Sequence, residues 1–255
     1  MFRDGRRRTM RFGLPIIATG SLAMAAASLY YATYSVRSQW LGRTYWHGRR
    51  DTNAVALTFD DGPSPDTENI LDVLAEHHVN ATFFMVGQEI ESFPGIAQRV
   101  LAEGHEVGNH SYSHPSYLFQ RSSETRNQVK RTQDVIAETI GLTPMLARPP
   151  YGVRTPAYFG ATRSLGLITV QWDVAGFDWE RISPRQVADN VIRKARPGSI
   201  ILLHDGNSCK NRDRKNTVEA LPVIIKGLRT RDLHIAPLLQ LLPEDLRLDP
   251  GKAHS

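Results

Sequence analysis

Cysteine is almost absent from this 255-residue chain, in which Cys209 is the only one. A single thiol excludes an intramolecular disulfide and any zinc site that is built on several cysteines. Internal repeats and low-complexity segments are also lacking. The hydrophobic share of 41% is ordinary, and the length suffices for one domain with a sizeable core. We therefore expect one globular domain behind an N-terminal leader.

The globular part also lacks an excess of positive charge. The formal net charge is +5, but residues 1–53 hold nine arginines against two aspartates, a net of +7, which leaves −2 for the remainder. Nucleic-acid binding depends on Lys and Arg side chains that neutralise phosphates. The sequence therefore predicts no nucleic-acid partner.

Charged side chains are missing between Phe12 and Val36, a run that follows five arginines and is just long enough to cross a bilayer as a helix. Two interpretations stay open: a transmembrane anchor, or a signal peptide cleaved among the small residues 23–27. The uncharged run continues to Tyr34, and tyrosines suit a membrane interface, which favours the anchor. We divide this part into a basic segment (1–11), a membrane segment (12–36) and a polar linker (37–53).

After residue 53, short β-branched or aromatic runs alternate with amphipathic stretches of helical period. This rhythm predicts an α/β domain with a parallel sheet over residues 54–245, followed by a C-terminal tail at 246–255. The predicted strands cover residues 55–59, 82–86, 106–109, 145–148, 167–172, 199–203 and 233–236.

Chemically capable side chains stand at the ends of these strands. They are Asp60 and Asp61, His110, Arg148, Asp173 and Asp178, and His204 and Asp205. The carboxyl ends of parallel strands converge on one face, where barrels and open α/β sheets hold their active sites. Separate segments of the chain therefore predict one shared site.

His110 and His114 form an H-x-x-x-H pattern, which places two imidazoles on one side of a helical turn. With Asp61 they supply two nitrogens and one carboxylate oxygen, a ligand set that leaves a position open for water. The alternative is that both histidines only form hydrogen bonds within a loop. The predicted cofactor is one divalent ion, zinc first, with cobalt, nickel, manganese and iron also compatible with these donors.

Asp60 and Asp61 are consecutive, so one can bind the cation while the other stays free. Two neighbouring carboxylates repel each other when both are ionised, and a nearby cation relieves that repulsion. The metal and Arg148 are the candidates. The alternative interpretation of Asp-Asp-Gly-Pro is an ordinary solvated turn.

Five short motifs occur in a fixed order along the domain. They are Thr58-Phe59-Asp60-Asp61-Gly62, His110-Ser111-Tyr112-Ser113-His114, Arg148-Pro149-Pro150-Tyr151, Asp178-Trp179 and Leu202-Leu203-His204-Asp205. In these motifs the chain resembles the polysaccharide deacetylase family, the NodB-homology domain of carbohydrate esterase family 4. The resemblance covers roughly Ala54 to Leu242. It implies a distorted (β/α)7 barrel.

The resemblance also implies roles for individual residues. Asp60 would be the general base and His204 the general acid, while Asp61, His110 and His114 would hold the metal. Arg148 would orient the base, and the backbone N–H of Tyr151 would stabilise an oxyanion.

Around these groups the resemblance leaves some assignments open. Asp178 would pair with either His204 or Arg148, and Tyr151, Trp179 and Leu202 would line the acetyl pocket. Many relatives carry a further Asp three positions before the Asp-Trp pair, where this chain has Ala175. Asp173 is the candidate substitute.

The expected reaction is metal-dependent removal of N-acetyl groups from an N-acetylglucosamine-containing polysaccharide, either peptidoglycan or a chitin-like oligosaccharide, with release of acetate. An O-acetyl xylan esterase or other amide hydrolase is the first alternative, because a fold does not determine a substrate. A non-catalytic carbohydrate-binding barrel is the second. We expect a monomer at the bacterial cell membrane, with its catalytic domain outside the cytoplasm, or a secreted protein if the leader is cleaved.

Overall fold

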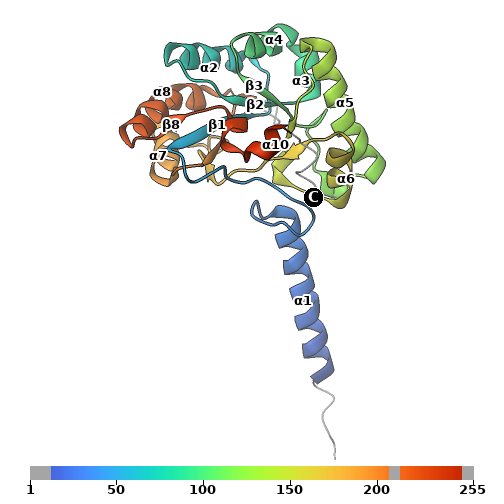
Figure 1. The fold of residues 1–255 in the computed structure, drawn as a ribbon. Coiled ribbons are helices and arrows are strands. Elements are labelled where there is room, and N and C mark those ends of the chain that lie inside the picture. The colour runs from blue at the N-terminus through green and yellow to red at the C-terminus, as the bar shows by residue number, and fades with distance from the viewer. Residues whose placement is uncertain (1–12, 207–212, 249–255) are drawn as a thin grey trace, which may run out of the picture.

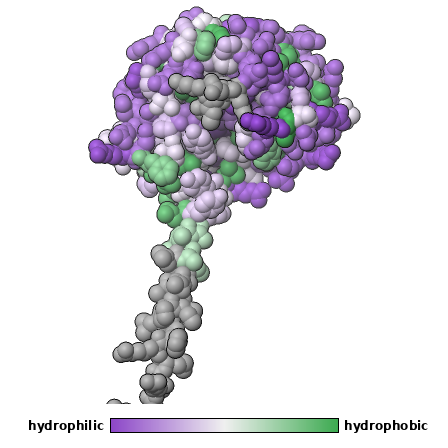
Figure 2. Space-filling view, turned by 180° about the vertical axis from the view of Figure 1, so that it is seen from behind, coloured by the Kyte–Doolittle hydropathy of each residue, from purple (hydrophilic) through white to green (hydrophobic). Residues whose placement is uncertain are grey.

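The structure is a computed structural model that describes residues 13–206 and 213–248. Helix α1 (Gly13–Tyr34) projects from one side of an α/β domain (Figure 1). Seen from behind, that domain is mostly hydrophilic, with a group of hydrophobic residues beside its junction with α1 (Figure 2). Within the described ranges, no helix combines the length and the apolar character that crossing a membrane requires. The predicted basic segment, the start of the membrane segment and Cys209 lie outside those ranges.

The domain is built on parallel strands, as predicted. They are β1 (Ala54–Asp60), β2 (Thr82–Met85), β3 (Glu106–Asn109), β4 (Leu146–Ala147), β5 (Ile168–Thr169), β6 (Val174–Ala175), β7 (Ile200–His204) and β8 (His234–Ile235). They pair in the order β5-β4-β3-β2-β1-β7-β6, and β8 pairs with the start of β1. The sheet curves as a half-barrel and stays open between β5 and β6, which do not pair with each other.

Helices cover the outside of this half-barrel (Figure 1). They are α2 (Pro65–Glu76), α3 (Gly87–Ser92), α4 (Pro94–Ala102), α5 (Ser122–Ile140), α6 (Pro156–Ser164), α7 (Pro184–Lys194) and α8 (Lys215–Thr230), with 3₁₀ turns at Tyr117–Phe119 and Pro150–Gly152. The short helices α9 (Leu238–Leu241) and α10 (Glu244–Leu248) instead pack their leucines in the hydrophobic cluster on the inner face. Local chemistry starts three of the outer helices. Ser64, Thr155 and Ser183 accept hydrogen bonds from the first turns of α2, α6 and α7, each followed by proline.

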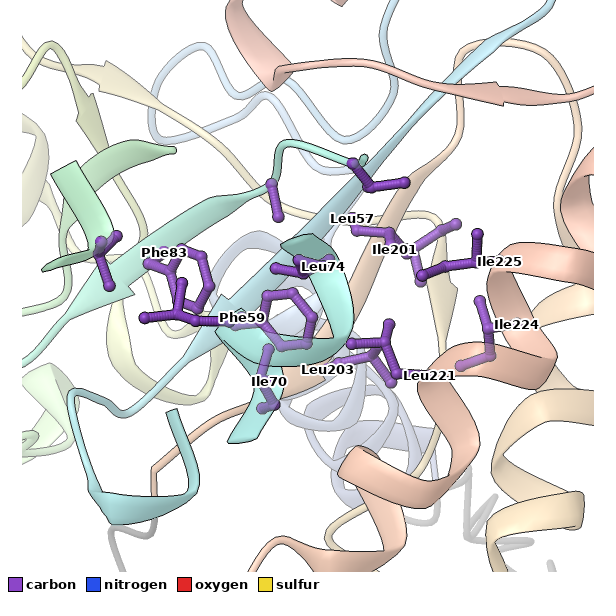
Figure 3. Close-up of a cluster of buried hydrophobic side chains, with 14 of the residues drawn as sticks. Leu57, Phe59, Ile70, Leu74, Phe83, Ile201, Leu203, Leu221, Ile224 and Ile225 are labelled. Carbon is purple, nitrogen blue, oxygen red and sulfur yellow. The ribbon is translucent and has the colours of Figure 1, made fainter. Parts of the chain in front are cut away.

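Alternation along β1 separates the two faces of the sheet. Val55, Leu57 and Phe59 point to the helix side, where they pack in the largest hydrophobic cluster (Figure 3). Thr58 and Asp60 point to the opposite, inner face. Each strand of this kind therefore has a structural face, and an inner face that is available for chemistry.

Residues 44–50, predicted as part of a linker, pair with the domain instead. Tyr45 forms a parallel bridge with Val170, and His47 forms an antiparallel bridge with Ser199. Tyr45 is buried in the inner hydrophobic cluster with residues of α9. The segment thus lies across the open side of the half-barrel and supplies backbone partners to the end of β5 and to the residues just before β7.

The end of α1 is also held by the domain, through Arg154. This arginine is 1% exposed, and its guanidinium donates hydrogen bonds to the carbonyls of Ser38 (3.0 Å), Thr33 (3.3 Å) and Ser35. The last carbonyls of a helix have no partner within the helix and carry the negative end of its dipole. A buried cation therefore satisfies the end of α1 without any carboxylate.

Candidate metal and catalytic site

The structure places the predicted groups on one face, at the carboxyl ends of the strands. Asp60 ends β1 and Asp61 follows it, His110 follows β3, Arg148 follows β4, and His204 ends β7. All five are buried or nearly so. Segments far apart in the sequence thus meet as predicted, because parallel strands all end at the same edge.

Asp61, His110 and His114 bring their ligand atoms together, each atom within 4.8 Å of the others. Asp61 Oδ1 lies 3.3 Å from His110 Nε2 and 3.0 Å from His114 Nε2. Two ligands of a tetrahedral zinc ion, each about 2.0–2.1 Å from the metal, stand roughly 3.3 Å apart. The spacing of these donors fits one divalent ion.

The orientation of each histidine also fits a ligand. His110 Nδ1 lies 2.7 Å from the Arg148 carbonyl oxygen and donates to it, which fixes the ring with Nε2 facing Asp61, where a bound ion would replace the proton that Nε2 shares with that carboxylate. The backbone N–H of His114 donates to Ser111 Oγ (3.0 Å). The ring of Tyr151 packs edge-on against His114, with 4.6 Å between centroids. Both rings are thus held in place before any ion binds.

Mutual charge dominates the electrostatics of this cluster. Burial works to raise the pKa of Asp61, but hydrogen bonds from His110 and His114 hold that pKa well below its usual value. Burial works to lower the pKa of His110, while the charge of Asp60 and the bond to Asp61 raise it. Asp61 therefore stays ionised, as a carboxylate that binds a divalent cation must be.

The orientation of the Asp60 carboxylate is set by its contact with Arg148. Arg148 Nη1 donates to Asp60 Oδ1 (2.7 Å) and to Thr58 Oγ1 (2.8 Å), and its side chain is fully buried. The other carboxylate oxygen, Oδ2, lies 3.7 Å from His110 Nε2. Asp60 thus presents one oxygen toward the ligand cluster and has the other one fixed.

Asp178 pairs with His204, which decides between the two partners that the sequence left open. Asp178 Oδ1 lies 2.9 Å from His204 Nδ1, and Oδ2 accepts bonds from the His204 N–H (2.7 Å) and Thr217 Oγ1 (2.8 Å). Burial alone would lower the pKa of His204, but the charge of Asp178 raises it to about 9. In the metal-free protein the imidazole is therefore protonated at neutral pH, and Nε2 is the ring nitrogen that Asp178 does not contact.

The three residues predicted to line the acetyl pocket surround these groups. Trp179 packs edge-on against His204, with 5.3 Å between ring centroids. Leu202 is buried two positions before His204, on the inner face of β7. Tyr151 is exposed and adopts a left-handed backbone conformation (φ 57°). The two aromatic rings thus stand beside His114 and His204.

Asp173 does not substitute for the aspartate that Ala175 replaces. It lies at the amino end of β7, where its carboxylate accepts from Arg50 (2.9 Å), the Ile200 N–H (3.0 Å) and Ser199 Oγ (3.2 Å). Strand position explains the difference, because Asp173 precedes β6 whereas Asp178 follows it. Thr217 and the His204 backbone complete the environment of Asp178 instead.

Gln171 was not predicted as part of the site, and Asp205 was predicted there without a role. Gln171 accepts from Arg148 Nη2 through its backbone oxygen (3.1 Å) and donates to the Gly152 carbonyl (3.1 Å). Asp205 is fully buried beside the loop that carries Asp60 and Asp61. Position after a strand was the signal for Asp205, but nothing local indicates the partner of either side chain.

Comparison with known proteins agrees with this geometry. A family model described as polysaccharide deacetylase matches residues 47–170. The peptidoglycan-N-acetylglucosamine deacetylase of Bacillus cereus is 39% identical over 185 residues, which are 72% of this chain and 66% of that protein, just under two thirds. A chitooligosaccharide deacetylase of Bradyrhizobium is 38% identical over 199 residues, 74% of this chain and 91% of that protein.

A solved structure shares the fold. It is the crystal structure of a peptidoglycan N-acetylglucosamine deacetylase in complex with an N-hydroxybenzamide compound, with a TM-score of 0.74 and 37% identity over 78% of this chain and 92% of that one. The half-barrel is thus consistent with the expected (β/α)7 deacetylase fold. On these matches, this chain belongs to the polysaccharide deacetylase family.

Proposed function

We propose that this chain is a metal-dependent hydrolase that removes N-acetyl groups from an N-acetylglucosamine-containing cell-wall polysaccharide and releases acetate. The observation that carries the proposal is the convergence of Asp61, His110 and His114 beside a carboxylate that Arg148 holds. The named activities of the relatives from Bacillus cereus and Bradyrhizobium support the substrate class.

Asp61, His110 and His114 would hold one divalent ion, zinc first, with cobalt, nickel, manganese or iron as alternatives. Such an ion lowers the pKa of bound water and polarises the acetyl carbonyl. Arg148 holds Asp60 with its second carboxylate oxygen toward the ligand cluster, where that oxygen is placed to accept a proton from the attacking water.

The opposite side of the site would supply the second proton. His204, protonated through its contact with Asp178, donates from Nε2 to the departing amine nitrogen as the carbon–nitrogen bond breaks. The backbone N–H of Tyr151 stabilises the oxyanion, and Trp179 with Leu202 encloses the acetyl methyl group. Acetate and a free amine are the products.

We further propose that the domain works outside the cytoplasm, attached to the membrane through residues 12–36 or secreted after cleavage. The absence of charge over that run supports this, as do the exposed Tyr30, Tyr34 and Trp40 at the domain end of α1. The apparent mass of the mature protein, and its partition between membrane and soluble fractions, separate the two routes.

The test is acetate release by the full-length chain from N-acetylglucosamine oligomers, peptidoglycan fragments and acetylated xylan. We expect release from the first two substrates, loss with a chelator, and recovery when zinc or cobalt is added back. Acetate from xylan alone would overturn the substrate class and favour an O-acetyl esterase. Binding of oligomers without any release would point to a non-catalytic barrel.

A further inference from the structure

A buried carboxylate that the proposed chemistry does not use lies directly after the general acid. Asp205 is fully buried, and its two oxygens accept hydrogen bonds from the Gly62 N–H (3.1 Å, to Oδ1) and from Thr67 Oγ1 (2.7 Å, to Oδ2). Both donors belong to the loop and helix that follow β1. Asp205 therefore joins the end of β7 to the segment that carries Asp60 and Asp61.

Backbone contacts strengthen the same connection. The N–H groups of Asp205 and Gly206 donate to the Asp60 carbonyl (3.1 and 3.3 Å), and Ser64 Oγ donates to the Asp205 carbonyl. The two segments touch so closely that a Cβ on Gly62 would lie 2.0 Å from Asp205 Oδ2. A Cβ on Gly206 would lie equally close, 2.0 Å, to the Asp61 carbonyl oxygen. Only glycine fits at either position.

The peptide that Asp205 grips is the one that aims Asp61. Asp61 has a left-handed backbone (φ 78°), which costs a residue with a side chain about 1–2 kcal/mol. The Gly62 N–H belongs to the peptide group immediately after Asp61, so a bond to that N–H restricts the ψ angle of Asp61. In this conformation the Asp61 carboxylate turns to His110 and His114, while Asp60 turns to Arg148.

We propose that Asp205 is a positioning residue: by holding the Asp61–Gly62 peptide, it keeps the Asp61 carboxylate in register with the two histidines. The inference rests on the metal site of the proposed function. Its direct consequence is for metal affinity, and the loss of activity follows from that. A buried carboxylate that only stabilised the fold would change the unfolding midpoint and leave metal affinity unchanged.

The chain contains a matched control at the other end of β7. The side chain of Asp173 is also buried, and its carboxylate likewise accepts one backbone N–H and one hydroxyl group, from Ile200 and Ser199, in addition to a bond from Arg50. It contacts none of the groups proposed for the chemistry among the described residues. Asp173→Ala therefore removes a buried carboxylate with at least as many partners, far from Asp61 along β7.

The experiment measures the affinity of the metal-free, full-length chain for zinc and cobalt, the visible spectrum of the cobalt form, and the thermal midpoint. We expect Asp205→Ala to weaken metal binding by about 10- to 100-fold and to change the cobalt spectrum, as loss of groups that orient a ligand typically does. Asp173→Ala should lower the midpoint and leave metal affinity within about twofold of wild type, because its contacts are remote from the ligands.

A milder pair of variants covers the case in which Asp205→Ala does not fold. Thr67→Val has the shape of threonine but removes the donor to Asp205 Oδ2, whereas Thr67→Ser keeps it. We expect weaker metal binding in the first and restored binding in the second. Native metal affinity in both Thr67→Val and any folded Asp205→Ala would overturn the inference. Because no substrate is involved, the result stands apart from the identity of the glycan; a wild-type chain that binds neither ion would overturn the metal site itself.

Discussion

The two ends of the strands use the left-handed backbone conformation differently. In the turns that lead from a helix to the next strand, the positions with positive φ are mostly glycine, namely Gly104, Gly141, Gly166 and Gly198, with His78 and Asp232 as exceptions. In the loops that follow the strands, it is mostly residues with side chains that adopt it, namely Asp61, Ser111, His114, Tyr151 and Phe177, with Gly152 as the exception.

The turns at one end of the strands only reverse the chain, whereas the loops at the other end also carry the side chains of the site. A turn needs only the backbone conformation, which glycine adopts without a steric cost. A site needs the side chain as well, so the cost of about 1–2 kcal/mol per residue is accepted and other contacts offset it. Asp61 and His114 are two of the proposed ligands, and Tyr151 packs against one of them. Strain in this domain therefore marks the functional face.

The largest expected effect is the loss of activity when Asp60 is changed, at the carboxyl ends of the strands. Asp60→Asn keeps an acceptor for Arg148 but removes the group proposed to take the proton, so acetate release should fall by about 10²- to 10⁴-fold. Steady-state kinetics with circular dichroism as the folding check measures this. Asp173→Asn, at the opposite end, should retain its rate; equal losses in both variants would show no functional difference between the ends.

A smaller effect, on stability, is expected from changing Arg154, which links the loop after β4 to the end of α1. Arg154 follows the left-handed pair Tyr151 and Gly152 and bonds to the end of α1. Arg154→Met leaves several buried carbonyls without a donor, so the free energy of unfolding should fall by about 3 kcal/mol. Denaturant unfolding of the full-length chain tests this.

Arg193→Met is the matched control, because that side chain is 80% exposed. We expect it to change stability by less than about 0.5 kcal/mol. Equal stability of the two variants would mean that the domain does not depend on the end of α1.

The pair His204 and Asp178 should make stability depend on pH. The pKa of His204 is raised from 6.5 to about 9, so the pair contributes fully below pH 6.5 and the contribution is lost as pH rises through about 9. In the metal-free protein, Asp178→Asn should therefore lower stability by roughly 2 kcal/mol at pH 6 and by much less at pH 10. Thermal unfolding at both pH values measures the difference. An identical loss at each pH would mean that the pair carries no such charge interaction.

The smallest effects are expected when a left-handed glycine receives a side chain, and when a left-handed residue with a side chain is replaced by glycine. Gly141→Ala adds a methyl group that meets no atom within 4 Å, so only the backbone changes, and stability should fall by about 1 kcal/mol with activity unchanged. Tyr151→Gly should do the reverse: stability stays equal or rises, and kcat falls because the loop is looser. Unfolding curves and kcat values for the same two variants measure these effects. A loss of activity in Gly141→Ala would contradict the separation of turns from functional loops.

Sequence reasoning located most of the candidate site because the signals for it are local. Short hydrophobic runs mark β1 and β7, and Asp60, Asp61 and His204 stand at their ends. It missed β6, which consists of Val174 and Ala175 alone. The strand predicted at 167–172 corresponds to β5, which in the structure ends at Thr169. Sequence reasoning also treated residues 44–50 as linker, since a polar segment gives no sign that its backbone will pair with Val170 and Ser199.

What the amino-acid sequence by itself determined is the order of strands and helices and the chemical groups at the strand ends, because both follow from periodicity and position along the chain. Only the tertiary structure decided which of these groups are paired. Asp205 binds the peptide of Gly62, 143 residues away, and Asp173 binds Arg50, 123 residues away. Asp178, Asp173 and Asp205 are the same residue type with three different partners, and their neighbours are set by how the strands pack rather than by the residues beside them.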